Sequence, residues 1–285
     1  RKPKAQRQPK PRKQARFNRM TKVISLSSDF GVGNKGIAVM ESVALGICPD
    51  AKIFNMSHGI PFFGISQGAR VLEATAYLPV GCHVMVVDPG VGTERRGVII
   101  ETGRGDKLIG PDNGVLLPAT RFLGGFKRAF QLKNEKYYRK PVSPVFHGRD
   151  VFIPAAAHIC NGVKLEDFGP ELKEGELVKA PYDEAKVDDN KIIARIIDVN
   201  NFGSPFLNIM QGVMHELFEP GDLIRASLNG KNFDLPYKRT YGDVKVGEAL
   251  LVDDDFGRVE VAVNQGFFIN KFNAKVGNEI ILEKR

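Results

Sequence analysis

The 285-residue chain contains no tryptophan and only three cysteines, Cys48, Cys82 and Cys160, which lie far apart in the sequence. This spacing excludes a disulfide framework and a Cys-x-x-Cys metal site, and it indicates reduced core thiols in a cytoplasmic protein. The chain also lacks long apolar runs, because Asp, Pro, Gly or His interrupts each one before it reaches the length of a membrane span. No apolar signal segment follows the charged N-terminus. We therefore expect no membrane segment.

Several common catalytic signatures are missing as well. The stretch Gly31-Val32-Gly33 lacks the third glycine of a dinucleotide-binding loop, and neither a Walker A loop nor a Gly-x-Ser-x-Gly elbow occurs. No histidines show His-x-x-x-His or His-x-His spacing, so neither a resident metal nor a cofactor is expected. The alternative is a metal site assembled in space from Asp29, His58, Asp88, Asp112 and His147.

Positive charge is concentrated at the N-terminus. The chain has a net charge of +8, but residues 1–20 alone carry nine Lys or Arg and no acid. The rest of the chain is therefore close to neutral, which argues against a nucleic-acid-binding body. A tail rich in Pro, Gln, Arg and Lys buries too little apolar surface to fold, so residues 1–20 are predicted to be disordered. Two interpretations stay open: a solvated extension, or an arm that binds nucleic acid or another polyanion.

Residues 21–172 have the pattern of an α/β domain. Short β-rich runs at Lys22–Ser27, Ala51–Asn55 and His83–Val87 alternate with helix-like segments at Lys35–Gly46 and Gln67–Tyr77. Strands that alternate with helices predict a mostly parallel sheet that is covered on both faces.

The pattern changes after a polar, charged segment at 173–190, which we interpret as a linker. Residues 191–285 contain short strand-like runs separated by turns, with no helix-strand alternation. That pattern predicts a small all-β domain of barrel-like type.

Polar residues follow three of the predicted strands. Asp29, His58 and Asp88 each come after a strand and have glycine nearby. Open parallel sheets carry their sites at the carboxyl ends of their strands, so this edge is the expected site. Asp88 is the most informative, because it directly follows a buried strand and precedes a glycine-rich turn; the alternative is that it only caps a helix or forms the turn.

Two later loops are less specific. Pro111-Asp112-Asn113-Gly114 is explained by turn chemistry alone. In His147-Gly148-Arg149-Asp150, the acid is a good helix cap and the arginine can pair with a neighbouring acid. His147 has no such structural explanation and is a candidate for proton transfer.

Taken together, these motifs resemble one family, the S-adenosylmethionine (SAM) hydroxide adenosyltransferases, which are SAM hydrolases related to the fluorinase and chlorinase. The similarity extends over about residues 21–285 and is densest before residue 160. The motifs that carry it, in order, are Ser28-Asp29-Phe30-Gly31, Ser57-His58, Val86 to Thr93 with Arg95-Arg96, Pro111 to Gly114, and Phe146 to Asp150.

The resemblance implies a catalytic triad of Asp88, Arg95 and His147 that activates water for attack on C5′ of SAM, which yields adenosine and methionine. Halide-using relatives carry other residues at the Asp and His positions and a large inserted loop. Here both residues are kept, and the segment from Arg96 to Pro111 is too short for that insert. The resemblance therefore favours water over halide, with the halide-using reaction as the alternative.

The resemblance also implies the ligand contacts. Asp29 would hold the ribose hydroxyls, Phe63 would line the sulfonium pocket, Asp198 would pair with the methionine ammonium, Phe206 would stack on adenine, and Asn264 would read the adenine edge. It further implies a homotrimer in which the sites lie between subunits, with SAM or adenosine as the ligand.

One departure from the family pattern concerns the methionine end. Asp254-Asp255-Phe256-Gly257 occupies the position of the usual Asn-Ser-x-Gly, and two acids are poorly suited to hold a carboxylate. Three further hypotheses therefore stay beside SAM hydrolysis: a metal-dependent hydrolase, an enzyme for another adenosyl sulfonium, and a non-catalytic protein that binds adenosyl ligands or polyanions.

Overall fold

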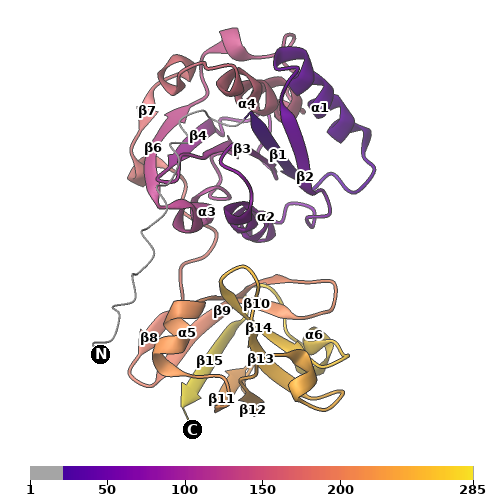
Figure 1. The fold of residues 1–285 in the computed structure, drawn as a ribbon, viewed down its shortest axis with the longest axis vertical. Helices are drawn as coiled ribbons and strands as arrows, with labels where there is room; N and C mark the ends of the chain where they lie inside the picture. The colour runs from indigo at the N-terminus through magenta and orange to yellow at the C-terminus, as the bar shows by residue number, and fades with distance from the viewer. Residues whose placement is uncertain (1–21, 285) are drawn as a thin grey trace, which may run out of the picture.

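A seven-stranded sheet forms the N-terminal domain in the computed structural model, which describes residues 22–284 (Figure 1). The predicted tail at 1–20 lies outside these residues. The strand order across the sheet is β2 (Lys52–Ser57), β1 (Val23–Ser28), β3 (Cys82–Val86), β5 (Lys107–Pro111), β4 (Gly97–Thr102), β6 (Phe126–Gln131) and β7 (Glu171–Leu172).

The sheet is mixed. Strands β2, β1, β3 and β5 are parallel, whereas β4 pairs antiparallel with both β5 and β6, and β7 is antiparallel to β6. The four residues 103–106 that join β4 to β5 are too few for a crossover helix, so these strands form a hairpin. The predicted α/β domain is confirmed, with an antiparallel portion at one side of its sheet.

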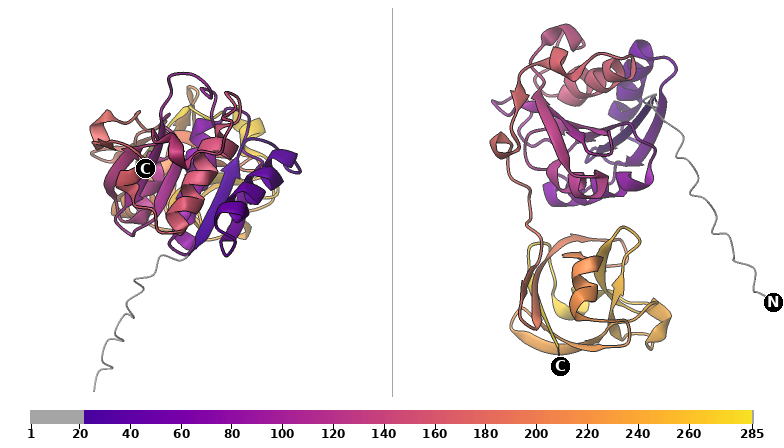
Figure 2. Two further views of the ribbon diagram at one scale, coloured as in Figure 1. Left: turned by 90° about the horizontal axis from the view of Figure 1, so that it is seen from above. Right: turned by 60° about the vertical axis from the view of Figure 1, so that its left-hand side comes forward.

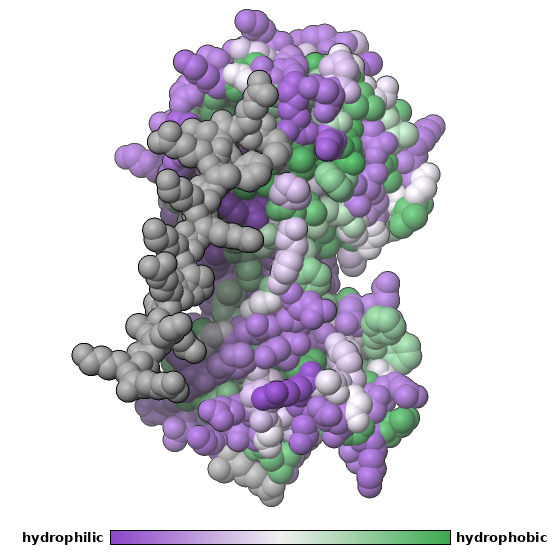
Figure 3. Space-filling view, in the orientation of Figure 1, coloured by the Kyte–Doolittle hydropathy of each residue, from purple (hydrophilic) through white to green (hydrophobic). Residues whose placement is uncertain are grey.

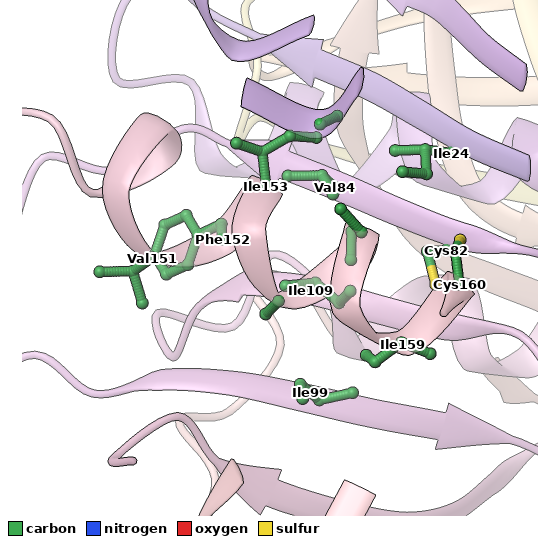
Figure 4. Packing of buried hydrophobic residues seen from close by; sticks show 14 of the residues in the cluster. Ile24, Cys82, Val84, Ile99, Ile109, Val151, Phe152, Ile153, Ile159 and Cys160 are labelled. Atoms are coloured by element: carbon green, nitrogen blue, oxygen red, sulfur yellow. The ribbon is translucent and has the colours of Figure 1, made fainter. Parts of the chain in front are cut away.

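Helices cover both faces of this sheet (Figures 1 and 2). Helices α1 (Lys35–Ile47) and α4 (Ile153–Cys160) lie on one face, and α2 (Ile65–Glu73) and α3 (Leu117–Thr120) lie on the other. Figure 4 shows Ile153 and Ile159 of α4 over the strand residues Val84 and Ile109. Because both faces are packed, β1 and β3 are buried along their whole length, as the continuous apolar run His83–Val87 predicted for β3.

The C-terminal domain is an antiparallel β-structure. Its strand order is β12 (Lys231–Pro236), β11 (Leu223–Leu228), β15 (Glu279–Lys284), β9 (Lys191–Val199), β10 (Pro205–Met210), β14 (Arg258–Val263) and β13 (Ala249–Asp253), and β8 (Lys186–Asp188) pairs with β9. A bridge between Tyr237 and Leu251 brings the two ends of this order together, so the sheet is a nearly closed barrel. Helices α5 (Gln211–Leu217) and α6 (Phe268–Phe272) complete the predicted barrel-like domain.

The two domains form two lobes with a notch between them on the right-hand side of Figure 3. The contact runs through α2, where the Ser66 hydroxyl donates to the backbone carbonyl of Ile197 on β9 at 2.6 Å. Ile197 and Phe206 belong to the same apolar cluster as Leu72 of α2. None of the helices in residues 22–284 has the length and apolar character needed to cross a membrane.

Candidate active site

Three polar side chains meet at the carboxyl end of β3. The Arg95 guanidinium donates from Nε to Asp88 Oδ1 at 3.0 Å and from Nη2 to Asp88 Oδ2 at 2.5 Å. The same Nη2 lies 3.1 Å from Nδ1 of His147. The Arg95 side chain is 9% exposed and that of Asp88 5% exposed, so the cluster is shielded from bulk water. The three residues of the predicted triad therefore lie in one hydrogen-bonded group with Arg95 at its centre.

Two glycines allow the loops that carry these side chains to approach one another. Gly92 has a φ of +76°, and a Cβ atom there would lie 2.2 Å from the carbonyl oxygen of Pro144. A Cβ atom on Gly148 would lie 2.9 Å from Val86 and 3.1 Å from Met40. Because neither position tolerates a side chain, the loop after β3 packs directly on the loop that ends at His147.

The hydrogen bond to Arg95 fixes the protonation state of His147. A guanidinium can only donate, so Nδ1 must be the acceptor, and the ring is neutral with its proton on Nε2. Burial lowers the pKa of His147 below its ordinary value of 6.5, and the nearby positive charge of Arg95 lowers the pKa further. His147 is therefore uncharged at neutral pH.

Burial has the opposite effect on Asp88. Loss of water around the carboxylate raises the pKa of Asp88 above 3.8, although the ion pair with Arg95 acts against this rise. The Arg95 guanidinium also lies over the ring of Phe152, 5.3 Å from its centre, and this contact further restricts the guanidinium. The cluster thus combines a carboxylate of increased basicity, a neutral imidazole and a fixed cation.

Asp29 lies at the same edge of the sheet. Ser28 pairs with Val86 across β1 and β3, so the residues that follow both strands emerge side by side. The Asp29 carboxylate accepts from the backbone N–H of Phe63 at 2.9 Å. Phe63 has a φ of +62° and is 70% exposed, an unusual backbone conformation for a bulky residue. Asp29 therefore fixes the loop that presents the Phe63 ring at the surface.

His58 supports the loop that carries Asp29. Its Nε2 lies 3.0 Å from Asn55 Oδ1, and because the Asn55 amide nitrogen donates to Glu41, this Nε2 must donate. Nδ1 then accepts from the Ser28 hydroxyl at 2.7 Å, and the His58 carbonyl accepts from Gly31 N–H at 2.8 Å. Burial lowers the pKa of His58, in agreement with a neutral ring. His58 thus holds the chain on both sides of Asp29.

Two further acids, Asp112 and Asp150, are engaged in structural bonds. Asp112 is buried, pairs with Arg96 and accepts from Val178 N–H at 2.9 Å, which ties the segment after the α/β domain to the sheet. Asp150 is buried, pairs with Arg149 and accepts from Ser143 N–H at 2.8 Å. These bonds shape the loops around the cluster.

Asp198 and Phe206 face each other across β9 and β10. Burial raises the pKa of Asp198 to about 6, although its carboxylate accepts from the Val199 N–H at 2.8 Å. The Phe206 ring packs against the apolar cluster under the α/β sheet, and the guanidinium of Arg70 lies 5.0 Å from its centre. Both residues therefore lie where the β domain contacts α2.

Asn264 lines a separate cavity of about 450 Å³ in the β domain. Its side-chain amide donates to the Val244 carbonyl at 2.7 Å. The aromatic lining comes from Phe202, Tyr241 and Phe267, and the carboxyl of Glu260 accepts from the Tyr241 hydroxyl at 3.1 Å. These residues were not among the predicted ligand contacts, although Phe202 stands beside a glycine in a turn, an unusual place for a large apolar side chain.

A second cavity of about 710 Å³ lies between the domains. Asn34, Glu41 and His58 of the α/β domain line it together with Asn201 of the β domain. Asn34 also caps α1, since its side chain accepts from Gly36 N–H at 2.8 Å. In the range 22–284, no three His, Cys, Asp or Glu side chains are grouped as metal ligands would be.

Comparison with known proteins agrees with this architecture. The chain is 36% identical to the (R)-S-adenosyl-L-methionine hydrolase of Salinispora tropica over 244 residues, which cover 85% of this chain and 90% of the relative. It is 32% identical to the protein of the same name from Thermus thermophilus over 264 residues, covering 90% and 97% of the two chains.

A crystal structure of an uncharacterized conserved protein from Thermotoga maritima matches the fold with a TM-score of 0.84 at 30% identity. The match covers 92% of this chain and 100% of that one. Residues 24–169 match the model of the SAM hydroxide adenosyltransferase N-terminal domain, and residues 194–281 match that of the C-terminal domain. The chain therefore belongs to the SAM hydroxide adenosyltransferase family.

Proposed function

We propose that this protein hydrolyses SAM to adenosine and methionine by attack of an activated water on C5′. The observation that carries the proposal is the shielded cluster in which Arg95 hydrogen-bonds both Asp88 and His147. Membership of the family and the names of the relatives, which are SAM hydrolases, support the same reaction.

The reaction needs a nucleophile more than it needs help for the leaving group. In SAM the sulfur already carries a positive charge, so methionine departs as a neutral thioether. As the bond from the water oxygen to C5′ forms, the bond from C5′ to sulfur breaks, and its electron pair returns to the sulfur. The protein must therefore hold one water in line with the C5′–S bond and keep other water away.

The cluster supplies what that water requires. The Asp88 carboxylate can accept the proton of the water, because each of its oxygens keeps a second lone pair beside the one bonded to Arg95; Nδ1 of His147 can accept it only once its bond to Arg95 breaks. The fixed positive charge of Arg95 stabilises the hydroxide that develops as the proton leaves. No cofactor takes part in this scheme.

We assign the ligand contacts to residues of both domains. Asp29 holds the ribose hydroxyls, Phe63 lines the sulfonium pocket through its exposed ring, and Asp198 pairs with the methionine ammonium. Asn264 and Phe206 are assigned to adenine. The cavity of Asn264 supports part of this assignment, because its aromatic walls at Phe202 and Phe267 suit a flat base.

The assembly that we propose is a homotrimer whose sites lie between subunits, in the cytoplasm. Exposed apolar side chains support the assembly: Phe62 is 75% exposed beside Phe63, and Phe202 is 77% exposed at the β-domain cavity. The cysteines support the compartment, since Cys48, Cys82 and Cys160 are all free thiols.

The test is chromatography of the purified protein after incubation with SAM. Adenosine and methionine should form in equal amounts in the wild type, with and without chelator, and should be lost with His147→Ala. Activity that disappears with chelator would favour a metal-dependent hydrolase. Formation of a halogenated adenosine in fluoride or chloride would favour the halide-using reaction. A folded wild type that releases no adenosine would overturn the proposal.

A further inference from the structure

Arg70 of α2 connects the two domains from a buried position. Its side chain is 5% exposed, and its Nη2 donates to the Asp254 carboxylate, while Nη1 donates to Glu73 at 3.1 Å. The guanidinium lies 5.0 Å from the ring centre of Phe206 and 5.5 Å from that of Phe256. Arg70 is therefore fixed by carboxylates at its end and by aromatic rings at its faces.

Arg70 is also unusual in having an unused donor. Its Nε is one of two buried side-chain polar atoms without a hydrogen-bond partner within residues 22–284. A buried N–H without a partner costs free energy, so this position has not been optimised for stability alone.

The turn Asp254–Gly257 is the second half of this connection. Asp254 Oδ1 accepts from Phe256 N–H at 2.7 Å and Arg258 N–H at 2.9 Å, and its Oδ2 accepts from Arg70. Both carboxylate oxygens are thus occupied within the chain. The Tyr77 hydroxyl, from the 3-10 helix Ala74–Tyr77 after α2, donates to the Asp255 carbonyl at 2.5 Å. The Asp254–Gly257 turn therefore fastens the β domain to α2 and to this 3-10 helix.

A second buried ion pair also joins the β domain to α2. Arg258 donates to Glu73 from Nε at 2.8 Å and from Nη2 at 2.5 Å, and the Tyr182 hydroxyl donates to Glu73 at 3.0 Å. Glu73 is thereby held by Arg70 of its own helix and by Arg258 of the β domain. Buried networks of this kind are sensitive to loss of any single partner.

Asp198 lies next to this network. It faces Phe206, on which Arg70 stacks, and the charged side chains that act on its carboxylate are Arg70 and Glu73 of α2. Of these, Arg70 favours the charged carboxylate and Glu73 disfavours it. The position and the charge of Asp198 thus depend on the same arginine.

We propose that Arg70 is a positioning residue for the β-domain half of the substrate site. By clamping the Asp254–Gly257 turn and the Phe206 ring to α2, it fixes where Asp198 lies relative to the α/β domain of its own subunit, and so how the β domain meets its neighbour in the proposed trimer. The inference rests on the proposed hydrolysis of SAM, in which Asp198 meets the methionine ammonium.

The experiment compares Arg70→Met, Arg70→Lys and the double variant Arg70→Met/Asp254→Asn by steady-state kinetics with SAM and by calorimetric SAM binding. Because the Asp88 cluster lies on other loops, Arg70→Met should raise KM about tenfold or more and change kcat less than about threefold. The acid limb of kcat/KM should shift to higher pH, since the pKa of the Asp198 carboxylate rises when the positive charge of Arg70 is removed. Arg70→Lys keeps the positive charge but loses the planar guanidinium that bonds Glu73 and Asp254 together. It should therefore leave the acid limb in place and still raise KM.

A purely structural role predicts a different result. Partial unfolding reduces the number of active molecules, so it lowers apparent kcat and leaves KM and the pH profile unchanged. In the double variant, position 254 is a neutral asparagine, so the loss of Arg70 leaves no unpaired charge there. Its kinetics therefore test the role of Arg70 if Arg70→Met alone does not fold. Arg128→Met is the matched control, because it removes an arginine of the same domain that pairs with Glu101 and Glu166 away from α2.

The outcomes separate this inference from the proposed function. Folded Arg70 variants with the KM, SAM affinity and acid limb of the control would overturn the role of Arg70. A wild type that binds SAM without turnover would overturn the hydrolysis, while the loss of SAM affinity in the variants would still support Arg70. A wild type that neither binds nor hydrolyses SAM would overturn both.

Discussion

The guanidinium of Arg95 hydrogen-bonds His147 at 3.1 Å while it holds Asp88 through two further bonds. The arginine therefore lies between the acid and the imidazole, and its positive charge acts on both groups. This arrangement requires a neutral His147 and keeps Asp88 charged despite its burial.

Replacing Arg95 with lysine should lower kcat about 10²–10³-fold, the usual cost of losing one preorganised donor to a developing oxyanion. Lysine keeps the charge but cannot bond Asp88 and His147 together. Steady-state kinetics with SAM measures the effect. Arg96→Lys is the control, because Arg96 makes a similar fork to Asp112 outside the cluster. Equal kcat values for the two variants would contradict the role of Arg95.

The protonation of His147 can be measured directly. Burial and the charge of Arg95 lower its pKa, so an NMR titration of the imidazole should give a midpoint below 6.5. Arg95→Met removes the charge and should move the midpoint upward. In the wild type kcat should persist below pH 6.5 and fall only as Nδ1 becomes protonated. A midpoint at or above 6.5 would show that the bond to Arg95 does not form in solution.

Gly92→Ala tests the close approach of the two loops. The new Cβ would meet the Pro144 carbonyl at 2.2 Å in a backbone conformation with φ of +76°, so the loop ending at His147 must shift. We expect kcat to fall about 10²-fold, because even small misplacements of catalytic groups lower kcat by about this factor. Gly46→Ala in α1 is the control, since no atom lies within 4 Å of the added carbon. A Gly92→Ala enzyme of normal kcat would mean that the loops are not coupled.

The partly buried, charged carboxylate of Asp198 should destabilise the folded protein at neutral pH. Its pKa is raised from 3.8 to about 6, so the folded state binds a proton more tightly than the unfolded state. The free energy of unfolding therefore falls as pH rises from about 4 to about 6 and stays lower above that range. Asp198→Asn should be more stable than the wild type at pH 8, by about 1–3 kcal/mol, and equal to it below about pH 4. Denaturant unfolding at both pH values measures this difference.

The same substitution should weaken SAM binding, because the ammonium loses its carboxylate. A variant that gains stability and loses affinity would identify Asp198 as a residue kept for binding. Equal stability of both proteins at pH 8 would contradict the unfavourable burial of its charge.

Much of the site was predictable because it follows strands with strong sequence signals. The run before Asp88 is continuous, β-branched and ended by Pro-Gly, and the parallel pairing of β1 with β3 then brings Asp29 to the same edge. The family resemblance, which rests on the order of the motifs, then identified His147 and Arg95 as the other members of the predicted triad. None of this required knowledge of side-chain geometry.

Other features had no local signal. The strand β6 carries Lys127 and Arg128 and shows no clear alternation, so it was not anticipated. The cavity aromatics Phe202, Tyr241 and Phe267 are single residues in turns or at helix ends, where no periodicity marks them. Arg70 and Asp254 are separated by 184 residues, and only the packing of the β domain on α2 brings them together.

The most direct test of the central claim is hydrolysis of SAM in water labelled with oxygen-18, with mass spectrometry of the adenosine produced. Attack of an activated water on C5′ predicts that the label enters the 5′-hydroxyl of adenosine, that methionine carries none, and that His147→Ala abolishes both products. Adenosine without label, or labelled adenosine formed equally well by the variant, would contradict the assignment of Asp88, Arg95 and His147 as the water-activating cluster.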